Sequence, residues 1–230
     1  MQCSTQEAIA AHEQTARACD ENPRAVWDAL LQEALGQYLS LARSLVAVCA
    51  RLEAKSVMMD LANYSATETL RDGRTVEIRA QRSQDREGMH AAILRSSSES
   101  LHRRFFAVRR EFSEKETDYF LDIDFVNHVA LVAVASDAGQ PTIVGGGRYV
   151  VVQPGQAEVA FAIIDAYQGL GIGSALMRHL ANLGRESGLH EFIAEVLSEN
   201  VPMLNVFERS GLAMSTERDG TVMHVTLRFA

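Results

Sequence analysis

The stretch AEVAFAIIDAYQGLGIGSALM, residues 157–177, decides the fold of this chain. Residues 157–164 are apolar except for one glutamate, which is typical of a buried strand. Glycines then alternate at Gly169, Gly171 and Gly173, and an apolar segment follows that favours a helix. Glycine allows backbone N–H groups to approach a ligand, and the free N–H groups and dipole of a helix start favour an anion. The stretch therefore predicts a strand, a loop and a helix, with a loop suited to a pyrophosphate.

Two familiar phosphate loops fit this stretch poorly. A P-loop ends in Gly-Lys-Ser/Thr, and residues 157–177 contain no lysine. The dinucleotide fingerprint requires a third glycine three residues after the second, and that position is Ser174 or Leu176, depending on which glycine is counted first. On the loop alone, a glycine-rich turn without a ligand stays open as an alternative.

Alternating strands and helices are predicted around the loop. An Asp72-Gly73 turn before the alternating strand 75–79 indicates a hairpin. Ser113 is a plausible helix N-cap, and further helices are predicted at 84–95, 99–106, 171–187 and 201–210. Strands are predicted at 128–135, 142–152, 157–164, 191–197 and 222–229. Gly145–Gly147 interrupt one of these strands, which predicts a bulge or a close approach of backbones.

Residues 1–65 have a different sequence pattern from the rest of the chain, and this pattern predicts a small helical N-terminal region. Asn22 before Pro23 is a good helix start, and apolar residues then recur every three or four positions from Trp27 to Leu52. An earlier short helix at about 6–18 would fold back on this one. Two helices bury little apolar surface alone, so we expect them to dock on residues 66–230 or on a second copy of the chain, as in a homodimer.

Composition restricts the classes of function. The net charge of −8 argues against nucleic-acid binding, which needs a basic stripe, and mildly favours a cationic partner such as an amine. No stretch approaches the roughly 18 apolar residues of a membrane span, and the N-terminus lacks a secretory signal. We therefore expect no membrane partner and a cytoplasmic location. The histidines show no ligand spacing, so no metal is expected.

The glycine loop resembles the acetyl-CoA signature Arg/Gln-x-x-Gly-x-Gly/Ala of the GNAT acetyltransferases, at Gln168, Gly171 and Gly173. A second resemblance follows in the expected order, because Asn200 ends a strand, a helix follows over 201–209, and Gly211-Leu212 leads out of it. The chain from about Thr67 to Ala230 is thus similar to GNAT N-acetyltransferases. The resemblance implies an α/β (α+β) fold over residues 66–230, with a mixed, mostly antiparallel sheet flanked by helices.

Several segments narrow the resemblance to the bacterial protein-lysine acetyltransferases called Pat. They are Val76–Arg79, Ser100 with Arg104–Phe106, Asp122–Phe125, Ala157–Phe161, and Leu197–Asn200 with Met203 and Leu204. This resemblance implies transfer of an acetyl group from acetyl-CoA to a protein lysine, with a metabolic enzyme such as an acyl-CoA synthetase as target. Some Pat proteins carry a cyclic-nucleotide-binding domain, but residues 1–65 are too few and too helical for that barrel, so regulation by cyclic AMP is not implied.

The resemblance also implies which residues bind acetyl-CoA. The strand backbone at its end is expected to pair with the pantetheine arm, and the loop N–H groups are expected to hold the pyrophosphate. Asn200 resembles the asparagine that contacts the cofactor arm; alternatively, it only caps the following helix. The expected residues are Ala162, Ile163, Ile164, Gln168, Gly169, Leu170, Gly171, Ile172, Gly173, Ser174 and Asn200.

Glu158 is the expected general base. A lysine amine is protonated near neutral pH, so a group must remove its proton before it attacks the thioester. Glu158 shares a strand face with Ala160 and Ala162, and apolar neighbours suit a carboxylate in this role. The Pat resemblance implies the same role for it. An ordinary solvent-facing glutamate is the alternative, and Glu195 and Glu199 are further candidates that are more typical of surface charge.

Phe207 departs from the family pattern. Many GNAT enzymes have a tyrosine seven residues after the asparagine, where it protonates the leaving thiolate, and Phe207 has no proton to give. Solvent or another group would then protonate the thiolate, since thiols are fairly acidic. Beside acetylation of a protein lysine, this leaves open acetylation of a small amine and a non-catalytic acetyl-CoA sensor.

Overall fold

The computed structural model describes residues 32, 43, 61–108, 110, 112–137 and 139–229. The chain divides into two units, Met1–Lys55 and Ser56–Ala230. In the first unit only Gln32 and Arg43 are described, and both are exposed helical positions. The two helices expected over residues 6–52 therefore lie outside the described residues, and the domain limit at 65/66 stays a prediction.

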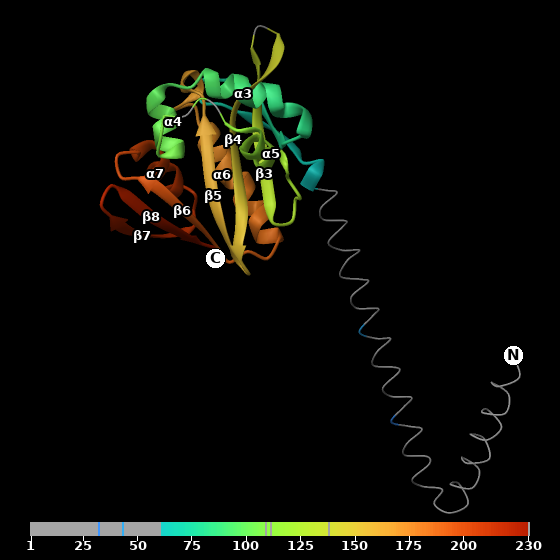
Figure 1. The fold of residues 1–230 in the computed structure, drawn as a ribbon, viewed down its shortest axis with the longest axis vertical. Coiled ribbons are helices and arrows are strands. Elements are labelled where there is room, and N and C mark those ends of the chain that lie inside the picture. Colours follow the sequence, from blue (N-terminus) through green and yellow to red (C-terminus); the bar gives the residue numbers. More distant parts are fainter. Residues whose placement is uncertain are drawn as a thin grey trace, which may run out of the picture. The chain divides into compact units, whose positions relative to one another are not determined.

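The second unit is built on one eight-stranded sheet (Figure 1). Its strand order is β1-β2-β3-β4-β5-β6-β8-β7, and neighbours are antiparallel except for β5 and β6, which are parallel. The strands are β1 (Ser65–Thr69), β2 (Thr75–Ala80), β3 (His128–Asp137), β4 (Gln140–Gln153), β5 (Gln156–Ile163), β6 (Glu191–Leu197), β7 (Ala213–Asp219) and β8 (Val222–Arg228). The expected mixed, mostly antiparallel sheet is confirmed.

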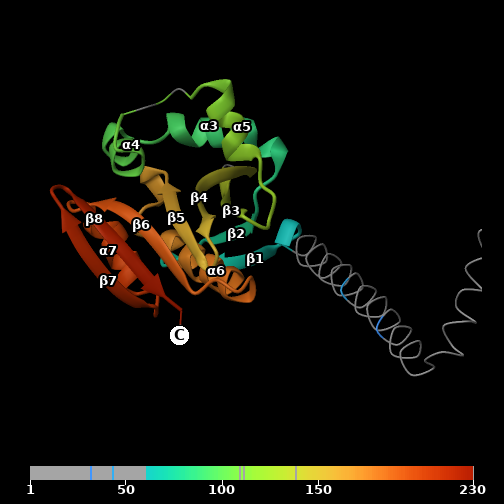
Figure 2. The same cartoon turned by 60° about the horizontal axis from the view of Figure 1, so that its bottom comes forward.

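Helices cover both faces of the sheet (Figures 1 and 2). On one face lie α3 (Arg86–Leu94), α4 (Ser98–Phe105) and α5 (Glu114–Leu121), and on the other lies α6 (Ile172–Glu186), which contacts α7 (Val201–Glu208). Short 3-10 turns, η1 (Ser83–Asp85) and η2 (Asp165–Tyr167), precede α3 and the glycine loop. The side chains of Ser97, Ser113 and Asn200 cap α4, α5 and α7, so the helix starts follow from local sequence.

The main core lies between the sheet and α6. Val159 and Phe161 of β5 belong to the same buried cluster as Leu180 of α6. Gly147 of β4 permits this packing, because a Cβ there would lie 2.7 Å from Phe161 Cδ1 and 3.1 Å from Leu180 Cδ1. The β3–β4 register also shifts between Ala133 and Val134, next to the glycines. The sequence predicts a bulge or a close approach of backbones at Gly145–Gly147; the register shift is the bulge, and the close contact at Gly147 is with side chains.

The parallel pair β5–β6 determines where a ligand can enter. The two strands pair only from Gln156 with Glu191 to Glu158 with Ile193. Beyond Glu158, β5 continues to Ile163 with β4 on one edge and no strand on the other. The strands diverge toward α4 (Figure 2). The divergence leaves a strand edge whose backbone groups are open to a ligand.

The predicted elements are confirmed within a few residues. The hairpin at Asp72-Gly73 is confirmed as well, because β1 pairs with β2 across it, although the sequence pattern predicts no range for β1. β7, at one end of the sheet, is not expected from sequence. β7 has six exposed side chains among its seven, so it shows no apolar alternation, and only its pairing with β8 makes it a strand. Among the helices of the described part of the chain, none is long and apolar enough to cross a membrane.

Replacing Gly147 by alanine is expected to destabilise the domain by about 1–3 kcal/mol, because the added methyl group overpacks the contact with Phe161 and Leu180. Gly173→Ala is the matched control. Its methyl group would lie 3.4 Å from Val206 Cγ2, an ordinary contact, and alanine is favoured over glycine in a helix by about 0.5–1 kcal/mol. Chemical denaturation measures both differences. A Gly147→Ala variant as stable as the wild type would contradict this packing.

Candidate active site

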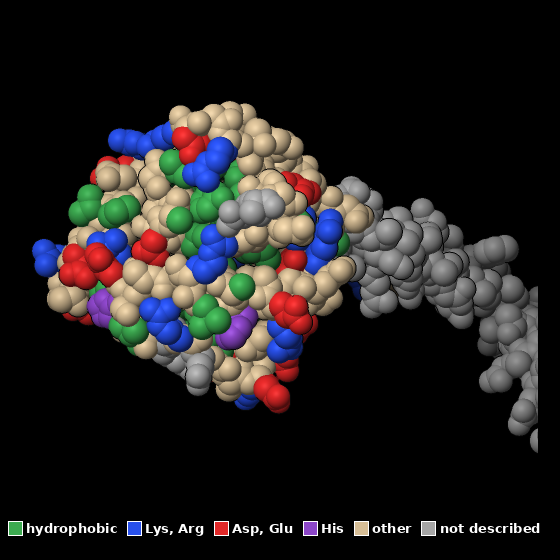
Figure 3. Space-filling view, turned by 90° about the horizontal axis from the view of Figure 1, so that it is seen from above, with side chains coloured by type: hydrophobic (Ala, Val, Ile, Leu, Met, Phe, Trp, Pro, Cys, Tyr) green, Lys and Arg blue, Asp and Glu red, His purple; other side chains and the backbone are tan. Residues whose placement is uncertain are grey.

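A cleft of about 530 Å³ opens where β5 and β6 diverge. Its lining includes Glu158, Ala160 and Ala162 from one face of β5 and Val159 and Phe161 from the other, so the cleft passes between the two strands. The glycine loop, α4 and the start of α7 form the remaining walls. Seen from the side of α3 and α4, hydrophobic side chains are visible in a depression with basic side chains beside it (Figure 3).

The loop before α6 presents a row of N–H groups. Ala175 is the first residue of α6 whose N–H has a backbone acceptor, Gly171 O at 3.0 Å. The N–H groups from Gly169 to Ser174 donate to no acceptor within the described part of the chain. Gly171 is the N-cap at φ 100°, a left-handed conformation that glycine adopts without strain. Free N–H groups at the positive end of a helix dipole make this loop an anion site.

Most of the residues expected at the cofactor line this cleft. They are Ala162, Ile163, Ile164, Gln168, Gly169, Gly171, Ile172, Gly173, Ser174 and Asn200. Leu170 is the exception, because its side chain packs against the hydrophobic core while its N–H belongs to the loop row. The sequence pattern places a residue in the loop but does not indicate the side to which its side chain turns.

Of the three positions expected to pair with the cofactor, Ile163 directs its backbone groups to the gap between β5 and β6, whereas Ala162 and Ile164 direct theirs to β4. Ile164 N–H donates to Val144 O of β4 at 3.0 Å, and Ile164 O accepts from Tyr167 N–H at 2.9 Å. Because backbone groups alternate along a strand, Ala162 also directs its N–H and C=O to β4. Ile163, and Phe161 two residues before it, direct theirs to the gap. Register with β4 decides this direction, so one strand's sequence cannot predict it.

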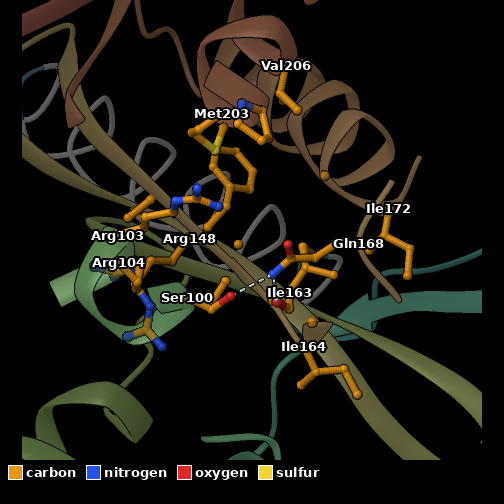
Figure 4. A pocket seen from close by; sticks show the side chains of 18 of the residues that line it. Ser100, Arg103, Arg104, Arg148, Ile163, Ile164, Gln168, Ile172, Met203 and Val206 are labelled. Atoms are coloured by element: carbon orange, nitrogen blue, oxygen red, sulfur yellow. Dashed lines mark hydrogen bonds between the residues drawn. The ribbon is translucent and has the colours of Figure 1, made fainter. Parts of the chain in front are cut away.

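Gln168 connects the loop to α4. Its Nε2 donates to Ser100 Oγ at 2.9 Å and to Ile163 O at 3.0 Å (Figure 4). Ser100 Oγ donates to Asp165 Oδ1 at 3.0 Å, and Ser97 donates to the same carboxylate from Oγ at 2.6 Å and from N at 2.7 Å. Desolvation raises the pKa of Asp165, but these hydrogen bonds outweigh it and hold that pKa below its usual range. The α4 wall is thereby fixed against the loop.

Asn200 both caps α7 and lines the cleft. Its Oδ1 accepts from Met203 N at 3.3 Å, which is the capping role considered as the alternative from sequence. Its Nδ2 has no partner among the residues that the structure describes, so one donor stays available for a ligand carbonyl.

Glu158 lies where the strands separate. It is the last residue of β5 that pairs with β6, and its exposed side chain lines the cleft on the face shared with Ala160 and Ala162. Glu195 of β6 also lines the cleft, and its Oε1 lies 3.5 Å from His224 Nδ1. Glu199 is exposed and is not part of the lining. Two carboxylates therefore face the cleft.

Arg71 is a cleft residue that sequence reasoning missed. It lies in the turn between β1 and β2, where its Nη1 donates to Gly169 O at 3.2 Å and its N–H donates to Leu170 O at 3.1 Å. A cation therefore lies against the glycine loop, at a position 98 residues away along the chain. Arg178, the arginine nearest the loop in sequence on α6, instead pairs with Glu68 at 2.6 Å.

Three more arginines, Arg103, Arg104 and Arg148, gather at the opposite end of the cleft from Ile172 (Figure 4). Phe207, in the position where many relatives carry a tyrosine, is 1% exposed and packs on Phe161 with ring centroids 6.2 Å apart. Within the described ranges, no group of three or more His, Cys, Asp or Glu side chains is arranged to hold a metal.

Comparison with known proteins identifies the family. The model of the acetyltransferase (GNAT) family matches residues 96–212, the span that holds α4, β5, the glycine loop and α7. The chain belongs to the GNAT family. It is an acetyl-CoA-dependent N-acetyltransferase, and the suitability of the loop for a pyrophosphate agrees with this.

Individual relatives are consistent with the family. The chain is 40% identical over 125 residues to acetyltransferase PA5475 of Pseudomonas aeruginosa, covering 54% of this chain and 67% of that one. It is 35% identical over 129 residues to acetyltransferase Pat of Mycolicibacterium smegmatis, covering 55% of this chain but only 38% of Pat. The crystal structure of the GNAT domain of S. lividans PAT matches with a TM-score of 0.65 and 33% identity, covering 72% of this chain and 97% of that domain.

Arg71→Ala is expected to weaken acetyl-CoA binding by about 10–100-fold, because it removes a charged donor beside the phosphate loop. The loss should shrink at high salt and disappear for acetyl-pantetheine, which lacks the phosphates. Isothermal titration measures each affinity. Arg178→Ala removes an equal charge that pairs with Glu68, and it should bind as the wild type does. If Arg71→Ala also bound as the wild type does, the phosphates would have to lie elsewhere.

Proposed function

We propose that the chain transfers the acetyl group of acetyl-CoA to the side-chain amine of a protein lysine, with Glu158 as the general base. The observation that carries this proposal is the position of Glu158. Its carboxylate faces the cleft at the last residue of β5 that pairs with β6. The pantetheine arm of acetyl-CoA, lying in the gap between the two strands, would have to end there. The thioester at the end of the arm would therefore lie beside the carboxylate.

The gap and the loop fit the shape of acetyl-CoA. The N–H row of Gly169–Ser174 and the guanidinium of Arg71 suit the pyrophosphate. The backbone groups of Ile163 and Phe161 are directed to the gap and suit the amides of the pantetheine arm, which would lie there as an added strand. The free Nδ2 of Asn200 supplies one more donor. Bound in this way, acetyl-CoA supplies an electrophilic thioester carbonyl.

Glu158 first accepts a proton from the lysine ammonium, whose ordinary pKa of about 10.4 keeps it charged at neutral pH. The freed lone pair of the nitrogen then forms the N–C bond to the acetyl carbon. The nitrogen, which still carries two protons, gives one of them to water, and the C–S bond breaks and leaves its electron pair on the CoA sulfur. Phe207 has no proton to give, so the thiolate is protonated by water, and the ordinary thiol pKa of about 8.5 makes it a good leaving group without an acid.

A protein lysine is favoured because of the likeness to the Pat-type enzymes. The solved domain of S. lividans PAT is 33% identical to this chain and is covered almost completely. Full-length Pat and the cAMP-binding acyltransferase from Mycobacterium smegmatis are covered only to 38% and 51%, so nothing is transferred from their other parts. Acetylation of a small amine by the same chemistry is the alternative.

Glu158→Gln is expected to lower kcat by about 10²–10⁴-fold, because the amide cannot accept the proton. The dissociation constant of acetyl-CoA should stay within a factor of about two, since Glu158 lies beyond the glycine loop and the edge of β5 at Ile163 that are proposed to bind the cofactor. Thiol release against a lysine peptide measures the rate, and titration measures the affinity. The same assay with small amines separates the two classes of acceptor.

Glu195→Gln is the matched control, because it removes the other carboxylate of the cleft. This variant should retain most of its activity. A Glu158→Gln enzyme as fast as the wild type across the pH range would refute Glu158 as the general base. Loss of activity only in Glu195→Gln would identify Glu195 as the base instead. Tight acetyl-CoA binding with no turnover on any acceptor would refute catalysis altogether.

A further inference from the structure

Arg148 faces the cleft without an anionic partner. It lies on β4, opposite Ala160 of β5, and therefore on the face of the sheet that carries Glu158. Its guanidinium donates to His128 Nε2 at 3.2 Å and makes longer contacts of 3.4 Å with Phe120 O and Gln81 Oε1. All of these partners are uncharged. Among the described residues, no carboxylate lies within ion-pair distance of Arg148.

Arg104 of α4 lines the same part of the cleft. Its guanidinium lies 4.9 Å from the centre of the Phe105 ring, and within the described part of the chain it makes no hydrogen bond and no ion pair. Burial lowers the pKa of Arg104, and among the described residues the charge of Glu158 opposes this shift. Arg103 beside it differs, because it is already paired with Glu99.

The two guanidinium groups, neither of which is paired with a described carboxylate, repel each other. Burial and the charge of Arg104 together lower the pKa of Arg148 to about 10. Glu195, the other carboxylate of the cleft, lies on β6 beside His224. Around Arg104 and Arg148, two cations therefore face the carboxylate of Glu158, which leaves a local net positive charge where a positively charged amine has to arrive. An incoming lysine ammonium alone would meet this excess charge, and partly buried charges are screened little by solvent. A carboxylate arriving with the amine would balance it.

We propose that Arg104 and Arg148 together bind a carboxylate that the acceptor carries beside its reacting amine. Two arginines provide planar donor pairs that match a carboxylate and bind it more strongly than neutral donors do. On a protein, the carboxylate would be an acidic side chain or a C-terminus next to the lysine; on a small molecule, it would be an amino-acid carboxylate. The proposal rests on the proposed function, since it adds a preference to the same acceptor site.

The acceptor, and not the donor, is the expected source of this carboxylate. In the proposed function the donor would lie in the gap between β5 and β6, whereas Arg148 lies on β4, across β5 from that gap. The cleft reaches Arg148 on the sheet face covered by α4 and α5, where Phe120 of α5 also lines it. An acceptor entering on this face would pass the arginine pair before it reached Glu158.

The test uses the full chain, acetyl-CoA and peptides that differ only beside one lysine, with Asp or Glu, Asn or Gln, or Arg as the neighbour. The wild type should acetylate the acidic peptides with a kcat/KM about 10–100-fold above that of the amide peptides, mainly through KM. Nα-acetyl-lysine should likewise surpass its carboxamide if a terminal carboxylate is used. Comparing these two pairs distinguishes side-chain from terminal carboxylates.

The variants Arg104→Gln and Arg148→Gln should each remove most of this preference, because kcat/KM falls on the acidic peptides and does not fall on the amide peptides, where removal of a positive charge eases the approach of the ammonium. Arg148→Lys should keep part of the preference for acidic peptides, because lysine keeps the positive charge but lacks the planar pair of donors of the guanidinium group. Arg178→Gln, which removes an arginine outside the cleft, should keep all of it. Acetyl-CoA titration confirms that each variant is folded.

Three outcomes would overturn this proposal alone. One is a wild-type enzyme with equal rates on acidic and amide peptides, a comparison that needs no variant. The second is an equal loss on both peptide series in the arginine variants. The third is a strong preference for succinyl-CoA over acetyl-CoA that the arginine variants abolish, since the carboxylate would then come from the donor. Lysine turnover without a carboxylate preference leaves the proposed function intact, whereas no turnover on any lysine peptide overturns both.

Discussion

Parallel pairing between β5 and β6 ends at Glu158 and Ile193, and the rest of the site depends on that ending. A strand edge without a partner needs donors and acceptors, and in this fold it faces a cleft instead of another strand. The same divergence places the start of α6 at one end of the cleft and Glu158 at the other. This arrangement matches acetyl-CoA, the cosubstrate of the GNAT family, which has an anionic pyrophosphate and an arm that contains amides.

Charge is divided along the cleft in a way that suits two substrates. Arg71 and the N–H row form a positive end, which we propose for the phosphates of the donor. At the other end, the carboxylate of Glu158 lies close enough to Arg104 to influence its charge, and Arg104 in turn acts on Arg148. Between these ends the lining is apolar, with Phe161, Phe207 and Val159. A dry middle section strengthens the electrostatic effect of the charged groups at each end.

Most elements of this fold can be predicted from the sequence, because the pattern that specifies each of them lies within its own segment. The glycine loop, the Ser113 cap and the apolar strand 157–164 each carry their own pattern, and each forms the predicted element. Contacts over long distances along the chain carry no such signal. Arg71 reaches the loop through a hairpin, and Arg148 reaches the cleft through the register of β4. The direction of the Ile163 and Ile164 backbone depends on that register as well, and β7 is a strand only because β8 pairs with it.

A crystal structure of the chain with acetyl-CoA would test the central claim most directly. The account predicts the phosphates within hydrogen-bond distance of the N–H groups from Gly169 to Ser174. The pantetheine arm should lie between β5 and β6 and pair with Ile163, and the acetyl carbon should lie beside Glu158. Phosphates bound away from the start of α6, or an acetyl group turned away from Glu158, would contradict it.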